Sequence, residues 1–409
     1  LWVLGIAVAL ATAASAAAFS ASAVLADDIT GSDGLAGIAA AGLTVGAALG
    51  AVPLARIMSS RGRRPGLGLG LWVSAAGGLI VAGAAGADLY VVVVIGTVTI
   101  GVGNAVALAA RFAAADLAEP SARGRAIGVV IWAATAGAVL GPILATSVAE
   151  PVATAVGAAE YVGTYLFSAL VLALGAVVVG HSLRPDPLLL ARSGGEAVPT
   201  RKDASLATGW VAIRASSRVA VATGGLVAAH IVMVGIMTVT PLHLSDGHNG
   251  LRIIGFVISV HILGMYAFSP IMGWLTDRIG APAVIVGGGI LLFLAAEMAA
   301  ATGPNERPEI FVALFLLGLG WSAELVAASS VIANQVPLGR KVAAQGVADL
   351  LMNSFGAASG IAAGFLLGSQ GFDTLGHAGA VLAVLVILAG LATLRFPPRP
   401  EPSGALIGS

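Results

Sequence analysis

The residues of this sequence best suited to bind a metal ion lie in one short stretch, 230–265. The whole chain has seven Met, six His and no Cys. Three of the Met and four of the His fall in this stretch: Met233, Met237, Met265, His230, His243, His248 and His261. Thioether sulfur and imidazole nitrogen together favour copper over zinc, magnesium or calcium. Because a thioether is uncharged, the pattern predicts a copper site that can load and unload within apolar surroundings.

The spacing of these residues places them on shared faces of two predicted helices. Met233 and Met237 are one helical turn apart, and so are His261 and Met265. A methionine stripe in an apolar helix more often packs than binds metal, so packing remains the alternative for either pair alone. Two such pairs in consecutive apolar segments favour the metal site.

The segments that carry these residues are apolar enough to lie in a membrane. The chain is 58% hydrophobic and 10% charged, with a mean hydropathy of +0.99, whereas a soluble domain carries about 25% charged residues. We expect twelve helical spans, near 1–26, 34–58, 67–87, 89–115, 124–148, 158–182, 217–242, 251–274, 281–302, 309–335, 342–368 and 374–395. The first is expected to be a retained span and not a cleaved signal peptide, because no basic leader precedes it.

A polar segment rich in Pro and Gly, 184–216, separates the first six predicted spans from the last six. It divides the chain into an N-terminal bundle at 1–183, a cytoplasmic linker and a C-terminal bundle at 217–409. With both termini and this linker in the cytoplasm, all but two of the twenty Lys and Arg residues fall on the cytoplasmic side. This asymmetry predicts that both termini are cytoplasmic.

A loop motif in the second half resembles that of a transporter family. Gly273, Asp277, Arg278 and Gly280 follow the spacing G-x-x-x-D-R-x-G. This motif is similar to a loop of the major facilitator superfamily. The resemblance implies an all-α membrane protein of twelve transmembrane helices, in which two six-helix bundles expose a central site to each side in turn. It also implies that the loop latches helix ends together in one access state.

The corresponding loop of the first half departs from this motif. Arg63 and Arg64 remain, but Ser59 stands where the motif has Asp. The loop is therefore interpreted either as a weaker latch or as a basic cytoplasmic turn.

The fifth predicted span contains Gly137, Gly141 and Pro142, a pattern that resembles the antiporter motif of the same superfamily. Small residues let a neighbouring helix approach, and Pro weakens the local hydrogen-bond ladder so that the helix can bend. In the family this pattern suggests export.

The metal-binding pattern narrows the resemblance further. The M-x-x-x-M and H-x-x-x-M pairs are similar to those of the CcoA-type copper importers of this superfamily, which supply copper for assembly of cbb3-type cytochrome c oxidase. The resemblance implies four copper-binding residues: Met233, Met237, His261 and Met265. Residue type and helical phase add four secondary candidates: His230, His243, Met272 and Met352.

This resemblance implies a bacterial cytoplasmic (inner) membrane protein with copper as its transported substrate, either as the ion or as a small chelate. Its other expected partners are membrane lipid and a cytoplasmic copper chaperone, with no nucleic acid and no prosthetic group. We expect a monomer. The sequence has no phosphate loop, nucleophile triad or H-E-x-x-H motif, so we expect no enzyme.

Carboxylates within predicted spans leave alternatives open. Glu324 and Asp349 are candidates to carry a coupling proton, because ionisable groups inside a membrane are costly and usually functional. Such coupling would suit an exporter of small hydrophobic compounds, in which the Met stripe is packing. A transporter-like receptor that senses copper without moving it is a third interpretation.

Overall fold

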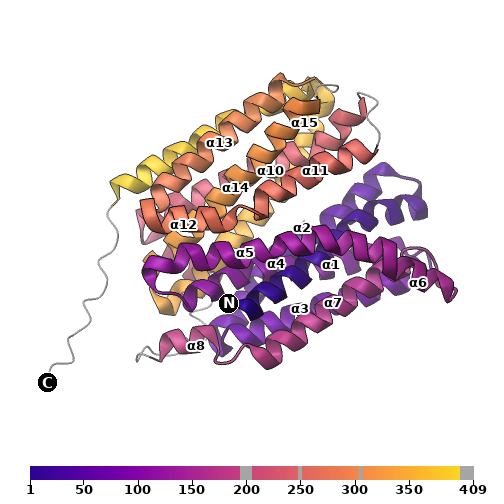
Figure 1. The fold of residues 1–409 in the computed structure, drawn as a ribbon, viewed down its shortest axis with the longest axis horizontal. Helices are drawn as coiled ribbons and strands as arrows, with labels where there is room; N and C mark the ends of the chain where they lie inside the picture. The colour runs from indigo at the N-terminus through magenta and orange to yellow at the C-terminus, as the bar shows by residue number, and fades with distance from the viewer. Residues whose placement is uncertain (194–204, 247–250, 304–306, 397–409) are drawn as a thin grey trace.

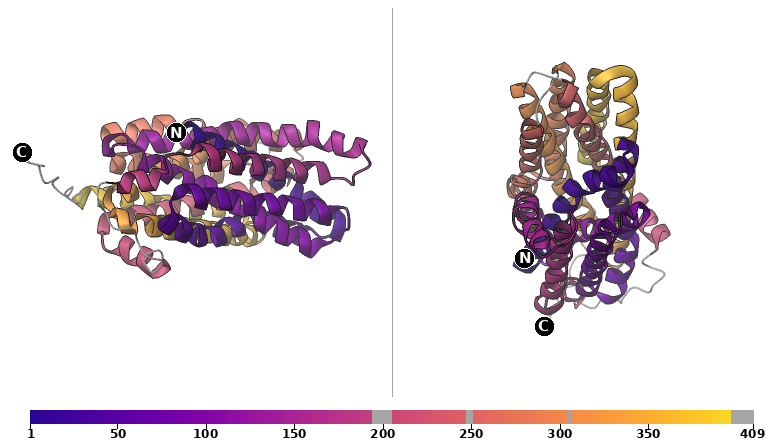
Figure 2. Two further views of the ribbon diagram at one scale, coloured as in Figure 1. Left: turned by 90° about the horizontal axis from the view of Figure 1, so that it is seen from below. Right: turned by 90° about the vertical axis from the view of Figure 1, so that its right-hand side faces the viewer.

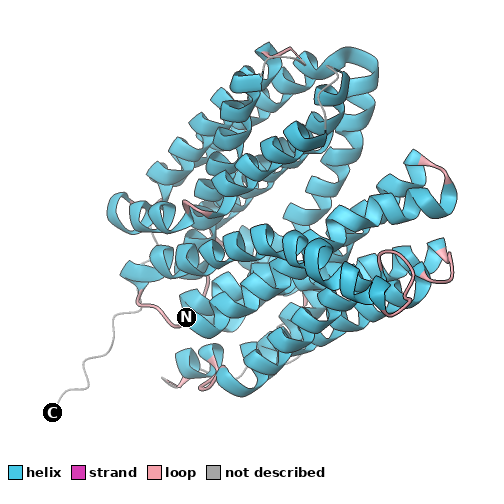
Figure 3. Cartoon of the chain, turned by 45° about the vertical axis from the view of Figure 1, so that its right-hand side comes forward, coloured by secondary structure: helices cyan, strands magenta, loops and turns pink. Residues whose placement is uncertain are grey.

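Helices joined by short loops make up the residues that the computed structural model describes, 1–193, 205–246, 251–303 and 307–396, and these residues contain no strand (Figure 3). The membrane-length helices of the first half are α1 (Trp2–Thr30), α2 (Asp33–Arg61), α3 (Arg63–Ala85), α4 (Tyr90–Asp116), α5 (Arg123–Leu144) and α7 (Val162–Ser182). The second half contains α10 (Ser217–Asp246), α11 (Leu251–Tyr266), α12 (Ser269–Ile279), α13 (Ala281–Ala301), α14 (Arg307–Gln335) and α15 (Leu338–Arg395), and there α11 and α12 together provide one membrane-length segment. Shorter elements are η1 (Pro120–Ala122), η2 (Ala145–Ala149), α6 (Glu150–Ala155), α8 (Pro187–Arg192) and α9 (Leu206–Arg214).

Eleven helical segments of the described residues are long and apolar enough to cross a membrane. One of them, α15, contains both the eleventh and the twelfth predicted spans. Its backbone departs from helical geometry at Gly371, with φ 89° and ψ 173°, so the chain bends there. Only glycine adopts this conformation without strain. The prediction of an all-α membrane protein of this architecture is confirmed.

The eighth predicted span is divided between two helices. Helix α11 ends at Tyr266 and α12 begins at Ser269, with Phe268 as its N-cap residue. The predicted linker 184–216 contains α8 and α9, and its residues 194–204 lie outside the described residues.

The helices form two groups that converge at one end of the molecule and diverge at the other (Figure 1). Helices α1 to α7 pack around one hydrophobic core, and α10 to α15 around another. The groups meet where α5 packs against α12 and where α2 packs against α15. We call the end that contains the junction of α5 with α12 the closed end, and the opposite end the open end. Figure 2 shows the same two groups from two further sides.

Glycines at the helix junctions allow backbones to approach within contact distance. A Cβ on Gly128 of α5 would collide with the Ser269 carbonyl of α12, and one on Gly273 would collide with the Gly124 carbonyl. Gly137 and Gly141 of the α5 pattern face the backbone of α1 in the same manner. Glycines of α5 thus let this helix pack against two neighbours, α1 within its own bundle and α12 across the junction.

Pro142 lies in α5 three residues before η2, a short π-helical segment. Proline removes one backbone donor and crowds the preceding turn. The backbone hydrogen bonding changes from α-helical to π-helical at Ala145, near the open end.

Candidate functional site

The closed end is fastened by a carboxylate from one bundle at a helix start of the other. Asp277 of α12 accepts hydrogen bonds from the backbone N–H groups of Gly124, at 2.8 Å, and Arg125, at 2.9 Å. The guanidinium of Arg125 adds a contact of 3.2 Å but is mostly exposed. Unpaired N–H groups and the helix dipole make the first turn of α5 a natural site for a negative charge. Asp277 therefore holds α5 and α12 together.

Buried polar contacts also cross between the bundles at Arg63. Its Nε donates to Asp116 at 2.8 Å, within the first bundle, and its Nη2 donates to Gln345 of α15 at 2.6 Å. The backbone N–H groups of Arg63 and Arg64 donate to Asp186, which also caps α8. Arg63 thus joins α3, α4 and α15.

An ion pair within the membrane-spanning region crosses the junction as well. Arg111 of α4 donates to Asp349 of α15 at 2.5 Å, and its Nε donates to Ser329 of α14 at 2.8 Å. The Arg111 side chain is fully buried, and that of Asp349 is 6% exposed. A third bond, to the Leu108 carbonyl, satisfies the remaining nitrogen. The positive charge of Arg111 is therefore neutralised where it lies.

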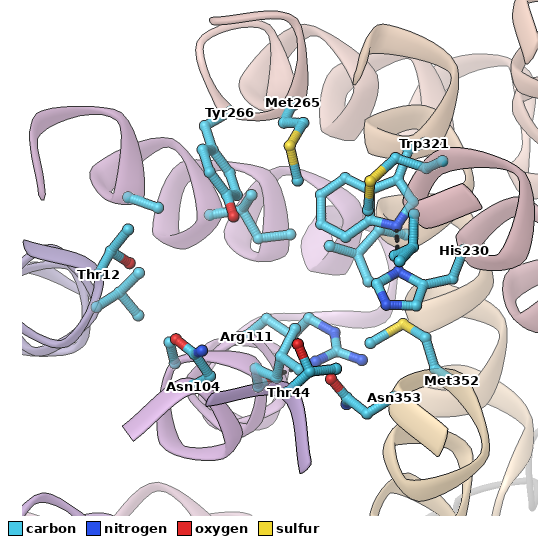
Figure 4. Close-up of a pocket in the computed structure, with 18 residues that line it drawn as sticks. Thr12, Thr44, Asn104, Arg111, His230, Met265, Tyr266, Trp321, Met352 and Asn353 are labelled. Atoms are coloured by element: carbon cyan, nitrogen blue, oxygen red, sulfur yellow. Dashed lines mark hydrogen bonds between the residues drawn. The ribbon is translucent and has the colours of Figure 1, made fainter. Parts of the chain in front are cut away.

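A cavity of about 220 Å³ lies between the two bundles, with Arg111 in its wall (Figure 4). Both bundles contribute to its lining: Val8, Thr12, Thr44, Asn104, Ala107, Leu108, Arg111, Ile131, Ala134, His230, Met233, Val234, Met265, Tyr266, Trp321, Leu325, Met352 and Asn353. These side chains combine two aromatic rings, three thioethers and two carboxamides. Apolar walls with a few fixed polar groups are typical of sites for small organic molecules.

The aromatic part of the wall is held in a fixed arrangement. Trp321 of α14 donates its indole N–H to Nδ1 of His230 of α10 at 2.9 Å. The Tyr266 ring packs edge-on against Trp321, with ring centroids 6.1 Å apart and planes at 85°. Edge-to-face packing of this kind stabilises both rings in place.

The structure brings together some of the predicted metal ligands and separates others. Met233 and Met265 line the cavity, together with the secondary candidates His230 and Met352. Met237, by contrast, is partly buried against the core of its own bundle and is absent from the cavity lining.

His261 and Met265 occupy one stripe of α11, yet only Met265 reaches the cavity. His261 is fully buried, with its Nδ1 2.8 Å from the Leu314 carbonyl of α14, and within the described part of the chain its Nε2 has no hydrogen-bond partner. Met272 is buried in α12, away from the cavity lining.

His243 stacks on Phe372, with ring centroids 3.9 Å apart, beside the bend of α15. His248 lies outside the described residues. Among the residues that the structure describes, no group of three or more His, Asp or Glu side chains is arranged to hold a metal ion.

The two predicted proton carriers have different surroundings. Asp349 pairs with Arg111 as described above. Glu324 of α14 is fully buried, and neither of its carboxyl oxygens has a hydrogen-bond partner among the described residues. The carboxyl group lies against Gly225 of α10, where a Cβ would come within 2.7 Å of Oε1.

Sequence reasoning missed the cation and the aromatic rings of the cavity. Arg111 was counted with the basic residues of a cytoplasmic loop, although it lies between Leu108 and Phe112 in an apolar run. These apolar neighbours were the feature of the sequence that could have indicated that Arg111 is buried. Tyr266 directly follows Met265, and its position beside a predicted ligand was the only indication of its role.

Comparisons with known proteins agree with this architecture. The Major Facilitator Superfamily model matches residues 3–253 and 227–408. The chain is 32% identical over 372 residues to the uncharacterized MFS-type transporter YdeG of Bacillus subtilis (strain 168), covering 91% of this chain and 86% of that protein. It is 25% identical over 358 residues to the riboflavin transporter RfnT of Brucella anthropi, covering 87% of this chain and 85% of that protein.

Among solved structures, a bacterial homologue of the iron transporter ferroportin in its outward-facing state superposes with a TM-score of 0.76. The alignment covers 96% of this chain and 98% of that chain, at 13% sequence identity. The likeness is one of fold.

Proposed function

The chain belongs to the major facilitator superfamily of membrane transporters, and we propose that it carries a small, uncharged heteroaromatic compound through the cavity between its bundles. The observation that carries this proposal is the lining of the cavity. Trp321 and Tyr266 offer flat aromatic surfaces, and Asn104 and Asn353 offer amides that both donate and accept hydrogen bonds. A heteroaromatic ring with polar edges matches both kinds of surface.

The charge of the site argues for an uncharged cargo. Arg111 is the cation in the cavity wall, and its guanidinium is already bonded to Asp349, Ser329 and the Leu108 carbonyl. An anionic cargo would have to compete with Asp349 for that cation. A neutral ring system fills the cavity without breaking the pair.

Transport in this proposal proceeds by alternating access between the bundles. We assign the closed end to the cytoplasm, because Arg61, Arg64, Arg125 and Arg278 lie at helix ends there and basic residues favour the cytoplasmic side. The described conformation is then closed toward the cytoplasm and open toward the outside. Both termini are cytoplasmic in this assignment, in a bacterial inner membrane.

The similarity to RfnT supports riboflavin as the first compound to test. The full chain would be reconstituted into lipid vesicles and uptake of radiolabelled riboflavin measured. Trp321→Ala is expected to lower uptake about tenfold or more, because stacking of a heteroaromatic ring on an aromatic side chain contributes about 1–3 kcal/mol. Trp132→Ala is the matched control, since Trp132 is 48% exposed on α5 and outside the cavity.

If wild-type vesicles took up no more riboflavin than protein-free vesicles, flavin-like compounds would be removed as the cargo. If Trp321→Ala and Trp132→Ala took up riboflavin equally well, the cavity would not be the site through which the cargo passes. Vesicles of both orientations distinguish import from export, and thus also test the alternative of a proton-coupled exporter of small hydrophobic compounds.

Copper import is the second candidate, and one observation favours it. Met233, Met265 and Met352 place three thioethers in the same cavity, and soft sulfur ligands select Cu(I). Of the four ligands implied by the CcoA-type resemblance, two line this cavity, and Met237 and His261 do not. In this candidate the imported copper would supply cbb3-type cytochrome c oxidase.

Radioactive copper uptake by the same vesicles tests this candidate. The double substitution Met233→Leu with Met265→Leu is expected to abolish copper uptake if these thioethers carry the ion. Met298→Leu is the control, because Met298 packs beside the core of the second bundle and is absent from the cavity lining. Copper uptake that survives the double substitution would refute transport by this route.

A further inference from the structure

His230 contributes an imidazole to the wall of the cavity, and its hydrogen bond determines which of its nitrogens carries the proton. The indole N–H of Trp321 approaches Nδ1 of His230 at 2.9 Å. An indole nitrogen only donates, so Nδ1 must accept and present its lone pair to Trp321. In the neutral ring the remaining proton is then on Nε2.

The surrounding residues keep the ring in this orientation. Trp321 is 3% exposed and is held by Tyr266, so its N–H has little freedom to turn away. On the far side of His230, a Cβ at Gly356 of α15 would lie 2.5 Å from Cδ2 and 2.8 Å from Nε2. Only glycine at this position leaves room for that edge of the ring.

The second ring nitrogen is directed into the cavity. Figure 4 shows the Nδ1 edge of His230 facing Trp321 and the opposite edge turned toward Met352, with the Arg111 guanidinium on the same side. None of the described residues accepts a hydrogen bond from Nε2. The group is therefore a donor already aimed at whatever occupies the cavity.

We propose that His230 is a specificity-determining residue whose Nε2–H, fixed by Trp321, donates a hydrogen bond to a carbonyl oxygen or ring nitrogen of the cargo. This inference rests on the proposed transport of a heteroaromatic compound and defines one recognition contact in it. Trp321 acts here as a positioning residue through His230, in addition to stacking on the cargo.

The same arrangement withholds the imidazole from a metal ion. A copper ion at Nε2 needs the lone pair there, so the proton would have to move to Nδ1. That proton would then face the Trp321 N–H, and two donors would oppose each other within 2.9 Å. Trp321 thus favours an organic acceptor over copper at this position.

The protonation pattern can be read directly. The full chain would be labelled with 15N-histidine, placed in lipid vesicles and measured by solid-state NMR at neutral pH, with His230→Gln identifying the His230 signals. The wild type is expected to show His230 protonated at Nε2 alone. Trp321→Phe, which removes the N–H and keeps an aromatic ring, is expected to show a mixture of both tautomers. A wild-type His230 protonated at Nδ1 would overturn the proposal, whatever the cargo.

Binding measurements test the consequence with riboflavin as the probe. His230→Leu is expected to weaken riboflavin binding about tenfold through loss of one hydrogen bond. His230→Gln restores a donor and is expected to regain most of that loss, so a general packing defect would be recognised by equal weakening in both variants. Equal binding by His230→Leu and the wild type would also overturn the proposal.

Measurements of Cu(I) binding distinguish failure of this inference from failure of the proposed function. Trp321→Phe is expected to bind Cu(I) more tightly than the wild type by several-fold, because the imidazole lone pair becomes available. A wild type that binds no riboflavin would refute the proposed cargo, while tighter Cu(I) binding by Trp321→Phe would still support the fixed tautomer. Unchanged Cu(I) binding in that variant would refute it.

Discussion

The carboxylate of Asp277 accepts a hydrogen bond of 2.8 Å from the backbone N–H of Gly124, so a residue of one bundle caps a helix of the other. The contact links sequence positions 153 residues apart across the junction that must open during transport. It is also the point at which the family loop motif meets the start of α5. The first prediction concerns this contact.

Asp277→Asn is expected to weaken the closed end by about 1–3 kcal/mol, because the neutral amide loses the charge-assisted bonds to the start of α5. The chain has no cysteine, so Val156→Cys and Ser369→Cys introduce unique label positions near the open end, one on each bundle. Spin-label distances between them are expected to shorten in Asp277→Asn. Glu119→Gln, an exposed carboxylate beside α5, is the control and should leave the distances unchanged.

The second prediction concerns the buried pair of Arg111 and Asp349. Asp349→Asn leaves the guanidinium buried without its counter-charge and is expected to cost about 3–5 kcal/mol of stability. Replacing both residues by Leu removes both charges and is expected to restore most of that loss. Thermal unfolding in detergent of Arg111→Leu, Asp349→Leu and the double variant measures the coupling of the pair as a cycle. Additive losses in that cycle would mean that the pair is not coupled.

The third prediction follows from the contact of α5 with α12. Gly128→Ala places a methyl group against the Ser269 backbone carbonyl, which cannot move aside as a side chain could. The two helices are therefore expected to separate, and the label distances at the open end to shorten as in Asp277→Asn. Gly287→Ala of α13 is the control, since no atom lies within 4 Å of the added Cβ. If Gly128→Ala had the same label distances as the wild type, the junction would have room for the added methyl group, contrary to the structure.

The fourth prediction concerns Glu324, whose carboxyl oxygens are buried without partners. A charge there would be costly in an apolar bundle, so the group is expected to carry a proton in this conformation. Glu324→Gln mimics that protonated form, and its thermal stability is expected to stay within about 1 kcal/mol of the wild type. In vesicles it should still exchange cargo but lose accumulation driven by a pH gradient. Glu309→Gln, exposed at the start of α14, is expected to retain both. Accumulation by Glu324→Gln equal to the wild type would exclude this carboxyl from proton coupling.

The sequence was sufficient to predict the membrane helices, because lipid tolerates only segments that satisfy their own backbone hydrogen bonds. It was less informative about which side of each helix faces the cavity. His261 and Met265 lie on the same stripe of α11, yet His261 packs against Leu314 of α14 while Met265 lines the cavity. Helical phase groups residues on a face, but the neighbours of that face depend on packing between distant helices.

The burial of Arg111 was not predicted from the sequence, for a similar reason. Counting Lys and Arg by loop treats every cation as lying in water, whereas Arg111 is buried and paired with a residue 238 positions away. A single sequence contains no direct record of such a pairing. The same holds for the bond between Trp321 and His230, which joins two helices that are far apart in the chain.

The two junctions at the closed end are chemically unequal. Asp277 caps the start of α5, but α15 begins at Pro337 and Leu338 with no side-chain cap, and Ser59 stands where the first-half loop would have its acid. The corresponding loops of the two halves therefore differ at the end where the pathway must open. We expect the α2–α15 contact to part first and the α5–α12 contact, which Asp277 fastens, to part after it. The exit for the cargo would then form to one side of the molecular axis, beside α2.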